Sequence, residues 1–325
     1  MSATPPISMG LPVYNGSPYL KELIECLLGQ TFGDFDLVIS DNASEDDTRD
    51  ICQHYAQADK RIRYYRNSEN IGLIRNYNRV FELSRAPYFK WVSHDDLYDP
   101  RYLERCYPAI RDDASISVSH CETRLIDSLG RSLPYNAALH YCTDSVNGRR
   151  WYLDRALCAT DGSPPKRFRD VLAYQIMCGP IYGLMPRHLL QSSGLNMSFF
   201  GSDKLLLAEM ALLGRFHIVP EVLFKKRMHG QMTSMLDEKK QWAHLDPNSG
   251  TKSLQAQKLS GYLAMLRRRN LSVGHRLACY YYLTVHSASS VLPLDWKYRP
   301  ASIPGDMAAG LQRFVGLRPR HRAGS

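Results

Sequence analysis

The sequence lacks the features that would mark a membrane-spanning or disulfide-rich protein. Its longest apolar stretch, residues 277–285, is far short of the ~20 residues that a membrane helix needs. Its 8 cysteines form no CxxC pair and have no metal-ligand spacing, so we expect reduced, mostly buried thiols. Residues 1–10 contain no basic stretch followed by an apolar run, and we therefore expect no secretory signal and a cytoplasmic protein.

Signatures of nucleic-acid binding are also missing, because neither a zinc finger nor an RNA-recognition motif is present, and no nucleic-acid partner is expected. The 325 residues are 44% hydrophobic, which is enough for a sizeable core in one or two domains. A formal charge of +9 favours anionic partners, among which nucleoside diphosphates and anionic lipids both fit.

The first hundred residues alternate short apolar runs with amphipathic helices. Apolar runs at 7–13, 37–39, 62–65 and 88–92 predict strands, and a helix is expected after each of the first three. Ser17-Pro18 begins the first of these helices as an N-cap followed by proline, and Ser44 with Asp47 begins the second as a capping box. Such alternation predicts an α/β fold with a doubly wound, mostly parallel sheet that binds ligands at the carboxyl ends of its strands.

The later part of the chain is less regular. We expect a hairpin edge at 115–127, loops that shape an acceptor site at 134–170, a helix after Ser202 and a strand at 217–223. Beyond residue 235 the composition becomes polar and charged, and two helices are expected at 256–269 and 275–287. The predicted division is a catalytic domain in 1–235, with nucleotide-sugar binding in 1–100 and the acceptor side in 101–235, and a helical extension in 236–325.

The tail at 305–325 has apolar residues at helical spacing and ends in Arg318, Arg320 and Arg322. Two interpretations remain for it, a peripheral contact with an anionic membrane and a solvated helix with a frayed basic end, and the second is the simpler. The sequence also leaves a homo-oligomer open.

Two polar pairs follow strands at the same edge of the predicted sheet. Asp95-Asp96 follows the fourth strand, where two carboxylates can hold Mg²⁺ or Mn²⁺ against a diphosphate, although such a pair alone is more often an acidic turn before a helix. Asp41-Asn42 ends the second strand, where a carboxylate can accept a hydrogen bond from a base such as uracil or merely precede a helix.

Over residues 7–234 the chain resembles the inverting family 2 glycosyltransferases of the GT-A fold. The opening segment ISMGLPVYNGSPYLKELIECLLGQTFGDFDLVISDNASEDDT is similar to the donor-binding start of that family, and NIGLIRNYN is similar to its N-x-G-x5-N stretch. The resemblance places Asp41 at the nucleotide base. It implies further contacts with the nucleotide or diphosphate from Pro12, Tyr14, Asn15, Asn70, Gly72 and Arg75.

The segment WVSHDDLYDP resembles the metal motif of the family. By that similarity Asp96 would bind the metal, and Asp95 would lie beside the ribose and diphosphate. The segment departs from the common D-x-D form, because Ser93 or His94 stands where the first acid is usual.

Two later segments resemble the catalytic part of the family. FFGSDKLLLAEM places the catalytic carboxylate on Asp203, for which a helix cap is the structural alternative. KKRMHGQMTS resembles the R-x-H segment, which places Arg227 near the donor phosphates and makes His229 a further metal ligand.

The resemblance implies a single displacement with inversion, in which Asp203 takes the proton of an acceptor hydroxyl and Mn²⁺ or Mg²⁺ stabilises the leaving diphosphate. A UDP-sugar is the favoured donor because a carboxylate can pair with the uracil N–H, with dTDP and GDP as alternatives. The acceptor would be a hydroxyl of a glycan or glycolipid in cell-surface synthesis.

Other functions fit the sequence less well. A sugar nucleotidyltransferase needs a glycine-rich, arginine-bearing loop, but residues 12–17 contain only Gly16, and the G-x-G-x-x-G of a Rossmann dehydrogenase is missing. A non-catalytic protein that binds nucleotide sugars or serves as a scaffold is the alternative from another class. Asp203 and His229 argue against it, although a fold by itself does not fix a function.

Overall fold

A computed structural model describes residues 4–136, 141–143, 150–152, 159–173, 179–197, 199–230, 232 and 254–291. By its internal contacts the chain divides into the units Met1–Leu283 and Thr284–Ser325. The first unit holds every sheet described below. Within the described residues, none of the helices has both the length and the apolar character needed to cross a membrane.

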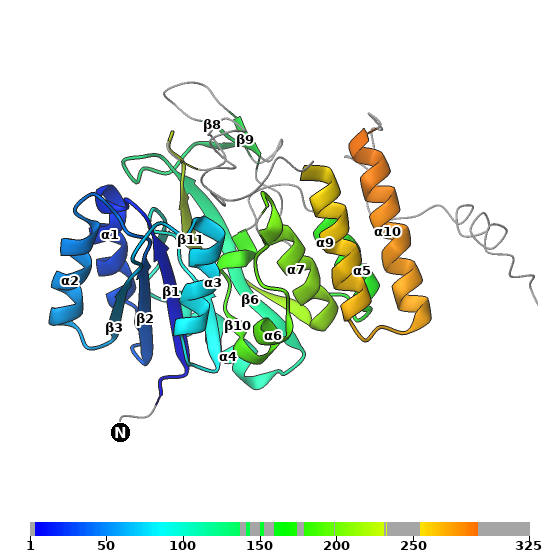
Figure 1. Cartoon of the computed structure of the whole chain (residues 1–325), viewed down its shortest axis with the longest axis horizontal. Helices are drawn as coiled ribbons and strands as arrows, with labels where there is room; N and C mark the ends of the chain where they lie inside the picture. The colour runs from blue at the N-terminus through cyan, green and yellow to red at the C-terminus, as the bar shows by residue number, and fades with distance from the viewer. Residues whose placement is uncertain are drawn as a thin grey trace, which may run out of the picture. The chain divides into compact units, whose positions relative to one another are not determined.

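The central sheet has five strands in the order β10-β4-β1-β2-β3. Four of them run parallel and β10 is antiparallel, so the predicted doubly wound, mostly parallel sheet is confirmed. Figure 1 shows β1, β2 and β3 side by side. Their bounds are Ile7–Val13 for β1, Phe35–Asp41 for β2, Ile62–Arg66 for β3, Tyr88–Trp91 for β4 and Met185–Pro186 for β10.

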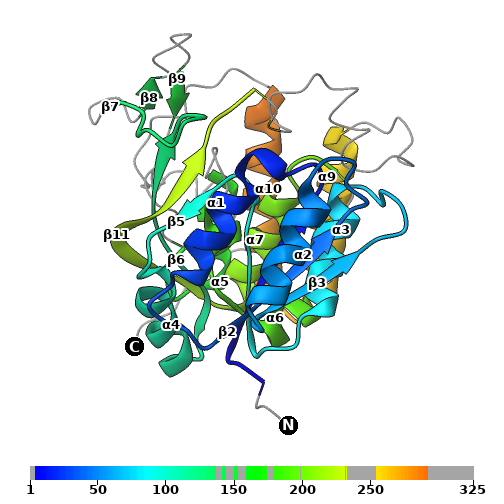
Figure 2. The ribbon, with the colours of Figure 1, turned by 90° about the vertical axis from the view of Figure 1, so that its left-hand side faces the viewer.

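Both faces of this sheet are buried. Neighbouring residues of a strand point to opposite faces, and here both kinds belong to hydrophobic cores. Leu37 and Ile39 of β2 belong to one hydrophobic core, and Val38 between them belongs to the other. The first core is shared with α1 and α4, and the second with α3 and α7. Figure 2 shows α1 and α2 in front of the sheet. The helices are α1 Ser17–Leu28, α2 Thr48–Ala58, α3 Leu73–Leu83, α4 Tyr102–Asp112 and α7 Ser202–Leu213.

A second sheet has the order β5-β11-β6, with bounds Leu97–Tyr98, Arg215–Arg227 and Ile116–Ile126. The strand expected at 115–127 is therefore present, and the turn expected after it closes a short hairpin, in which Ile126 forms an antiparallel bridge with Ser132. The main partner of this strand was not predicted. β6 pairs in parallel with β11, which lies about a hundred residues further along the chain. Pairing of this kind leaves no local signal in the sequence, whereas a hairpin would.

The loop region expected at 134–170 contains regular structure. Three short strands form a third sheet, and the helix α5 follows. The region has no clear period because its strands are only two or three residues long. Their bounds are Tyr135–Asn136 for β7, Tyr141–Thr143 for β8, Arg150–Tyr152 for β9 and Pro164–Ala173 for α5.

The remaining elements follow the central sheet in the chain. The two helices expected after residue 235 are present as α9 and α10, whereas the predicted tail at 305–325 lies outside the described residues. Figure 1 shows α9 beside α7. The bounds are Gly179–Tyr182 for the 3₁₀ helix η1, Arg187–Ser192 for α6, Leu254–Arg268 for α9 and Val273–Val291 for α10.

Candidate active site

The loops that follow β1 and β2 are joined by hydrogen bonds at the carboxyl edge of the sheet. Asn15, which has a left-handed φ of 50°, donates its N–H to Oγ of Ser44 over 3.0 Å. The N–H of Gly16 donates to Oγ1 of Thr48 over 2.8 Å. A Cβ atom at Gly16 would lie 3.1 Å from Cδ2 of His94, so the loop after β4 lies against the same turn.

Asp41 is enclosed where β2 ends. Its carboxylate accepts hydrogen bonds from the Tyr64 hydroxyl at 2.7 Å, from Nη1 of Arg66 at 2.6 Å and from the N–H of Ser44 at 2.9 Å. Arg66 is the register partner of Asp41 on β3, and its guanidinium covers a side chain that is 0% exposed. The predicted contact between Asp41 and a base thus stays a prediction, and Arg66 is the outer residue of the pair.

Sequence reasoning missed Arg66. The feature that indicates Arg66 is a basic residue at the end of β3, the strand next to β2, which ends in Asp41. The two residues are recognised as neighbours only when the parallel strands are placed in register.

Asparagine side chains build the loop that precedes α3. Nδ2 of Asn42 donates to Oδ1 of Asn70 over 2.7 Å, and Oδ1 of Asn42 accepts from Nδ2 of Asn67 over 3.0 Å. Gly72, whose φ is 86°, donates its N–H to Oδ1 of Asn70 over 2.9 Å. These contacts shape the loop and leave Arg75 exposed in the first turn of α3.

Pairing between β5 and β11 brings the acidic motif against the R-x-H segment. Leu97 of β5 lies opposite Lys225 of β11 in an antiparallel register, and the same register places Arg227 beside Asp95. Nε of Arg227 donates to the Asp95 carbonyl oxygen over 2.8 Å. The segments 95–96 and 227–229 therefore meet, as the resemblance implied.

Within this cluster Asp95 is the carboxylate that faces His229. Oδ2 of Asp95 lies 2.9 Å from Nε2 of His229, and Oδ1 accepts a short hydrogen bond from Oγ of Ser93. Burial alone would raise the pKa of Asp95, but the hydrogen bond with His229, the charge of His94 and the bond from Ser93 hold it well below its ordinary value. Asp95 is thus an ionised, strongly held carboxylate.

Asp96 points inward. Its Oδ1 accepts the N–H of Arg227 over 2.9 Å, and the residue is 2% exposed. Burial and the neighbouring charge of Asp95 raise the pKa of Asp96 to about 8, against the opposing effect of Lys226 and the Arg227 N–H. The assignment of the metal to Asp96 stays a prediction, and Asp95 is the better placed of the two carboxylates.

Arg227 is buried and has several protein partners. Nη2 donates to Oε2 of Glu22 over 2.7 Å, Nη1 donates to the Ser128 carbonyl oxygen over 3.1 Å, and the guanidinium carbon lies 4.6 Å from the centre of the Tyr19 ring. These contacts fix the end of β11 and with it the position of His229. A contact between Arg227 and donor phosphates stays a prediction.

The residues fit a metal ion that is shared with a bound nucleotide. Within the described ranges no three His, Cys, Asp or Glu side chains surround one point. Asp95 and His229 nevertheless converge, and the hydrogen bond between them joins a carboxylate, which suits Mg²⁺ or Mn²⁺, to an imidazole, which suits transition-metal ions. Such ions commonly take one or two protein ligands and complete their shell with substrate phosphates and water.

Asp203 lies in the first turn of α7. The N-cap of this helix is Gly201, which has a left-handed φ of 88°, and no side chain caps the helix. Oδ1 of Asp203 accepts only a local hydrogen bond, from the N–H of Lys204 at 2.8 Å. Gly201 and not Asp203 is thus the N-cap residue, although Asp203 binds a first-turn N–H of the helix, and its catalytic role stays a prediction.

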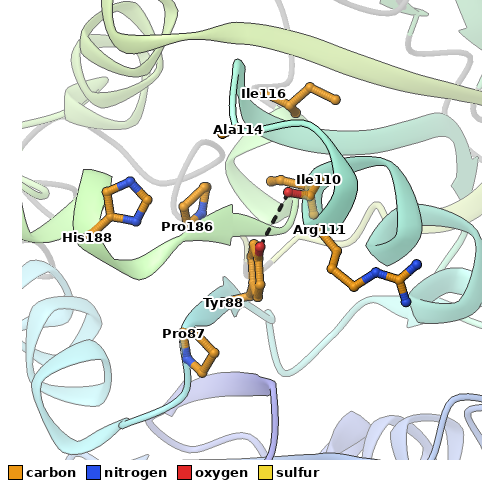
Figure 3. A pocket seen from close by; sticks show the side chains of 8 residues that line it. All are labelled: Pro87, Tyr88, Ile110, Arg111, Ala114, Ile116, Pro186 and His188. Carbon is orange, nitrogen blue, oxygen red and sulfur yellow. Dashed lines mark hydrogen bonds between the residues drawn. The ribbon is translucent and has the colours of Figure 1, made fainter.

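A cavity of about 140 Å³ lies elsewhere in the described part of the chain. Figure 3 shows Pro87, Tyr88 and Pro186 on its wall, with the Tyr88 hydroxyl donating to the Ile110 carbonyl oxygen over 3.4 Å. Tyr88 begins β4, whereas Asp95 follows the end of that strand. The cavity is thus at the opposite end of β4 from the acidic motif.

Comparison with known proteins agrees with this geometry. The family model described as "Glycosyl transferase family 2" matches residues 8–136. An uncharacterized glycosyltransferase of Rickettsia prowazekii is 27% identical over 237 residues, or 71% of this chain and 66% of the relative. Chondroitin synthase of Escherichia coli is 25% identical over 236 residues, or 72% of this chain but 31% of the relative.

Among solved structures, S. aureus TarS 1-349 in complex with UDP-GlcNAc superposes with a TM-score of 0.59 and 16% identity, covering 87% of this chain and 72% of that one. The fold is thus that of the GT-A glycosyltransferases, as predicted. Within that class, residues 8–136 are similar to glycosyltransferase family 2. The matched segment spans less than two thirds of the curated relatives above.

Proposed function

We propose that this chain transfers a sugar from a nucleoside-diphosphate donor to a hydroxyl of a glycan or glycolipid, with a divalent metal and with inversion at the anomeric carbon. The observation that carries the proposal is the 2.9 Å approach of Asp95 and His229 at the carboxyl edge of the sheet. In α/β sheets of this kind ligands bind at that edge. The relatives that resemble this chain are glycosyltransferases, which supports glycan synthesis as the setting.

The nucleotide would lie across the ends of β1, β2 and β3. Arg66, whose guanidinium is paired with the buried Asp41 carboxylate, offers N–H donors here, which complement the C=O groups on the edge of uracil. We favour a UDP-sugar on this ground, and the UDP-GlcNAc complex of TarS supports it. dTDP presents the same edge as UDP, and GDP also carries an N–H, so both remain alternatives.

Asp95 and His229 would hold the metal, with Asp96 behind them fixing the Arg227 backbone. When bound, Mn²⁺ or Mg²⁺ supplies positive charge next to the diphosphate that departs. Arg227 keeps this part of the site rigid through its bonds to the Asp95 carbonyl oxygen and to Glu22. A rigid arrangement of charges is the main source of electrostatic stabilisation in enzymes.

Asp203 would accept the proton of the acceptor hydroxyl as the hydroxyl oxygen bonds to the anomeric carbon and the bond to the diphosphate breaks. Its carboxylate is half-buried at the amino end of α7, and its one printed partner is a backbone N–H, which leaves acceptor capacity for a proton. We propose a cytoplasmic location, for which the sequence alone argues, with a peripheral membrane contact as an alternative.

Thermal unfolding with a panel of nucleotides tests the proposal. UDP, dTDP, GDP and ADP should be compared at equal concentration, with and without Mn²⁺. A ligand at 100 times its dissociation constant stabilises a protein by ~2.7 kcal/mol, so one diphosphate should raise the melting temperature clearly, and only with metal. No shift with any nucleotide would overturn the proposal. Binding without consumption of any nucleotide sugar would favour the non-catalytic alternative.

A further inference from the structure

The helix α9 packs directly on the segment that leads into the helix of Asp203. A Cβ atom at Gly261 of α9 would lie 2.9 Å from Cδ2 of Leu205, 3.4 Å from Sδ of Met197 and 3.4 Å from Cζ of Phe199. Leu205 is in the first turn of α7, two residues after Asp203. The absence of a side chain at Gly261 thus permits a close approach, and a larger residue there would require the Leu205 side chain to shift.

A second contact lies nearer still to Asp203. A Cβ atom at Gly201 would lie 3.3 Å from Cε and 3.4 Å from Nζ of Lys258. Gly201 is the N-cap of α7, and its left-handed φ of 88° sets the direction in which the helix starts. The side chain of Lys258 therefore covers the turn that orients Asp203.

The other end of α9 is fixed to α7 by ion pairs with a buried carboxylate. Glu209 of α7 is 2% exposed, and its Oε1 lies 2.7 Å from Nη2 of Arg268 and 2.8 Å from Nε of Arg269. Its Oε2 accepts the N–H of Gly194 over 2.9 Å. A buried carboxylate needs such partners, because an unpaired one would be strongly unfavourable. Glu209 therefore joins α7, α9 and the loop after α6.

That loop is also tied to the donor side of the protein. Nδ2 of Asn78 in α3 donates to the Asn196 carbonyl oxygen over 2.9 Å, and the N–H of Asn196 donates to Oδ1 of Asn78 over 3.2 Å. The chain that leads into Asp203 is thus held at one end by α3 and along its length by α9.

We propose that α9 fixes the position of Asp203, with Glu209 as the positioning residue that keeps α9 on α7. This inference rests on the proposed role of Asp203 as the base. Catalytic groups must be held within about 0.5 Å of their productive geometry, and a displacement of 1 Å can lower a rate by about 10²-fold. α9 would then serve transfer rather than nucleotide binding, although it lies beyond the boundary predicted at residue 235.

Glu209→Gln in the full chain is the test, because the amide keeps the shape of the side chain but removes the charge that holds Arg268 and Arg269. We expect the transfer kcat to fall by about 10²-fold while the dissociation constant for UDP with Mn²⁺ stays within about twofold. Hydrogen exchange should become faster in residues 199–206. Glu221→Gln is the matched control, since Glu221 also pairs with two arginines, Arg101 and Arg105, and should leave all three quantities unchanged.

Gly261→Ala offers a second variant, in which the ion pairs remain and the added methyl group presses on Leu205. It should give the same split between kcat and nucleotide affinity, to a smaller extent. An unchanged kcat in folded Glu209→Gln would overturn the inference, as would a parallel loss of kcat and UDP binding in both variants. If the wild-type protein transfers no sugar, the proposed function fails. Unaltered hydrogen exchange in residues 199–206 of Glu209→Gln would separately overturn the role of Glu209 in holding α9 on α7.

Discussion

Asp95 and His229 lie 134 positions apart in the sequence, yet Oδ2 of the first is 2.9 Å from Nε2 of the second. The approach depends on β5, which follows the acidic motif immediately and pairs with the end of β11. A two-residue strand thereby places an acid and an imidazole at the edge of the sheet where the donor diphosphate is expected.

The first prediction separates the two adjacent acids. Asp95→Asn should weaken Mn²⁺-dependent UDP binding by at least about 10- to 100-fold, because even the outer partners of metal ligands are worth that much. Asp96→Asn should cost less than about tenfold, because an amide oxygen can still accept the Arg227 N–H. Calorimetric titration of each variant with UDP, with and without Mn²⁺, measures both effects. The reverse order of losses would restore the assignment of the metal to Asp96.

The second prediction concerns recognition of the nucleotide base. Arg66→Met removes the guanidinium that lies 2.6 Å from the Asp41 carboxylate, and UDP should bind about 10- to 100-fold more weakly, which corresponds to one lost charged hydrogen bond. Arg63→Met is the control, because Arg63 pairs with Asp36 at the other end of the same two strands. Equal affinities in the two variants would show that Arg66 does not contact the nucleotide.

The sequence was sufficient for β1 to β4 and for α1 to α3, because each depends on a local period, whereas the two-residue strand β5 was not predicted. Leu37 to Ile39 is apolar throughout and is a strand buried on both faces, as such runs predict. Pairing between β6 and β11 was not predictable in this way, because its register places Val118 opposite Phe216 and depends on the tertiary fold.

The same distinction applies to the site. The residue types of the acidic motif and of the R-x-H segment were recognisable, and the structure brings them together. The backbone conformation after β4 decides which of the two neighbouring acids turns toward His229. The sequence motif does not specify that conformation. Arg66 became a candidate only when the register of β2 and β3 placed it beside Asp41.

The third prediction is a pH dependence of stability that comes from Lys90 of β4. Burial lowers the pKa of Lys90 to about 7, and its Nζ lies 3.6 Å from the centre of the Tyr98 ring and 4.4 Å from that of Tyr102. The unfolded chain holds this proton up to its ordinary pKa near 10.4, so between these values the unfolded state binds more protons and stability rises with pH.

Lys90→Met should therefore stabilise the protein most below pH 7, and the gain should shrink by up to about 1.4 kcal/mol per pH unit above that. Urea unfolding of both proteins at pH 6, 7, 8 and 8.5 measures the difference, in which the titrating groups that do not interact with Lys90 cancel. A difference that does not change with pH would mean that Lys90 keeps an ordinary pKa in the folded protein.

The fourth prediction tests the role of Asp203 as the general base. Asp203→Asn keeps the shape of the side chain but cannot take a proton, so transfer should fall by roughly 10² to 10⁴-fold. UDP affinity should barely change, because Asp203 lies on α7 and we propose that the nucleotide contacts come from the loops after β1, β2 and β3. With the acceptor in hand, wild-type rates in this variant would rule out Asp203 as the base.

The most direct measurement is the release of nucleoside diphosphate from nucleotide sugars by the full-length chain, with Mn²⁺ and with excess chelator. We predict that the wild-type protein releases UDP from at least one UDP-sugar only when the metal is present. Asp95→Asn should lose this activity together with nucleotide binding, whereas Asp203→Asn should lose transfer and keep binding. A folded wild-type protein that consumes no UDP-, dTDP- or GDP-sugar with Mn²⁺ or Mg²⁺, or that does so equally well in chelator, would contradict the account.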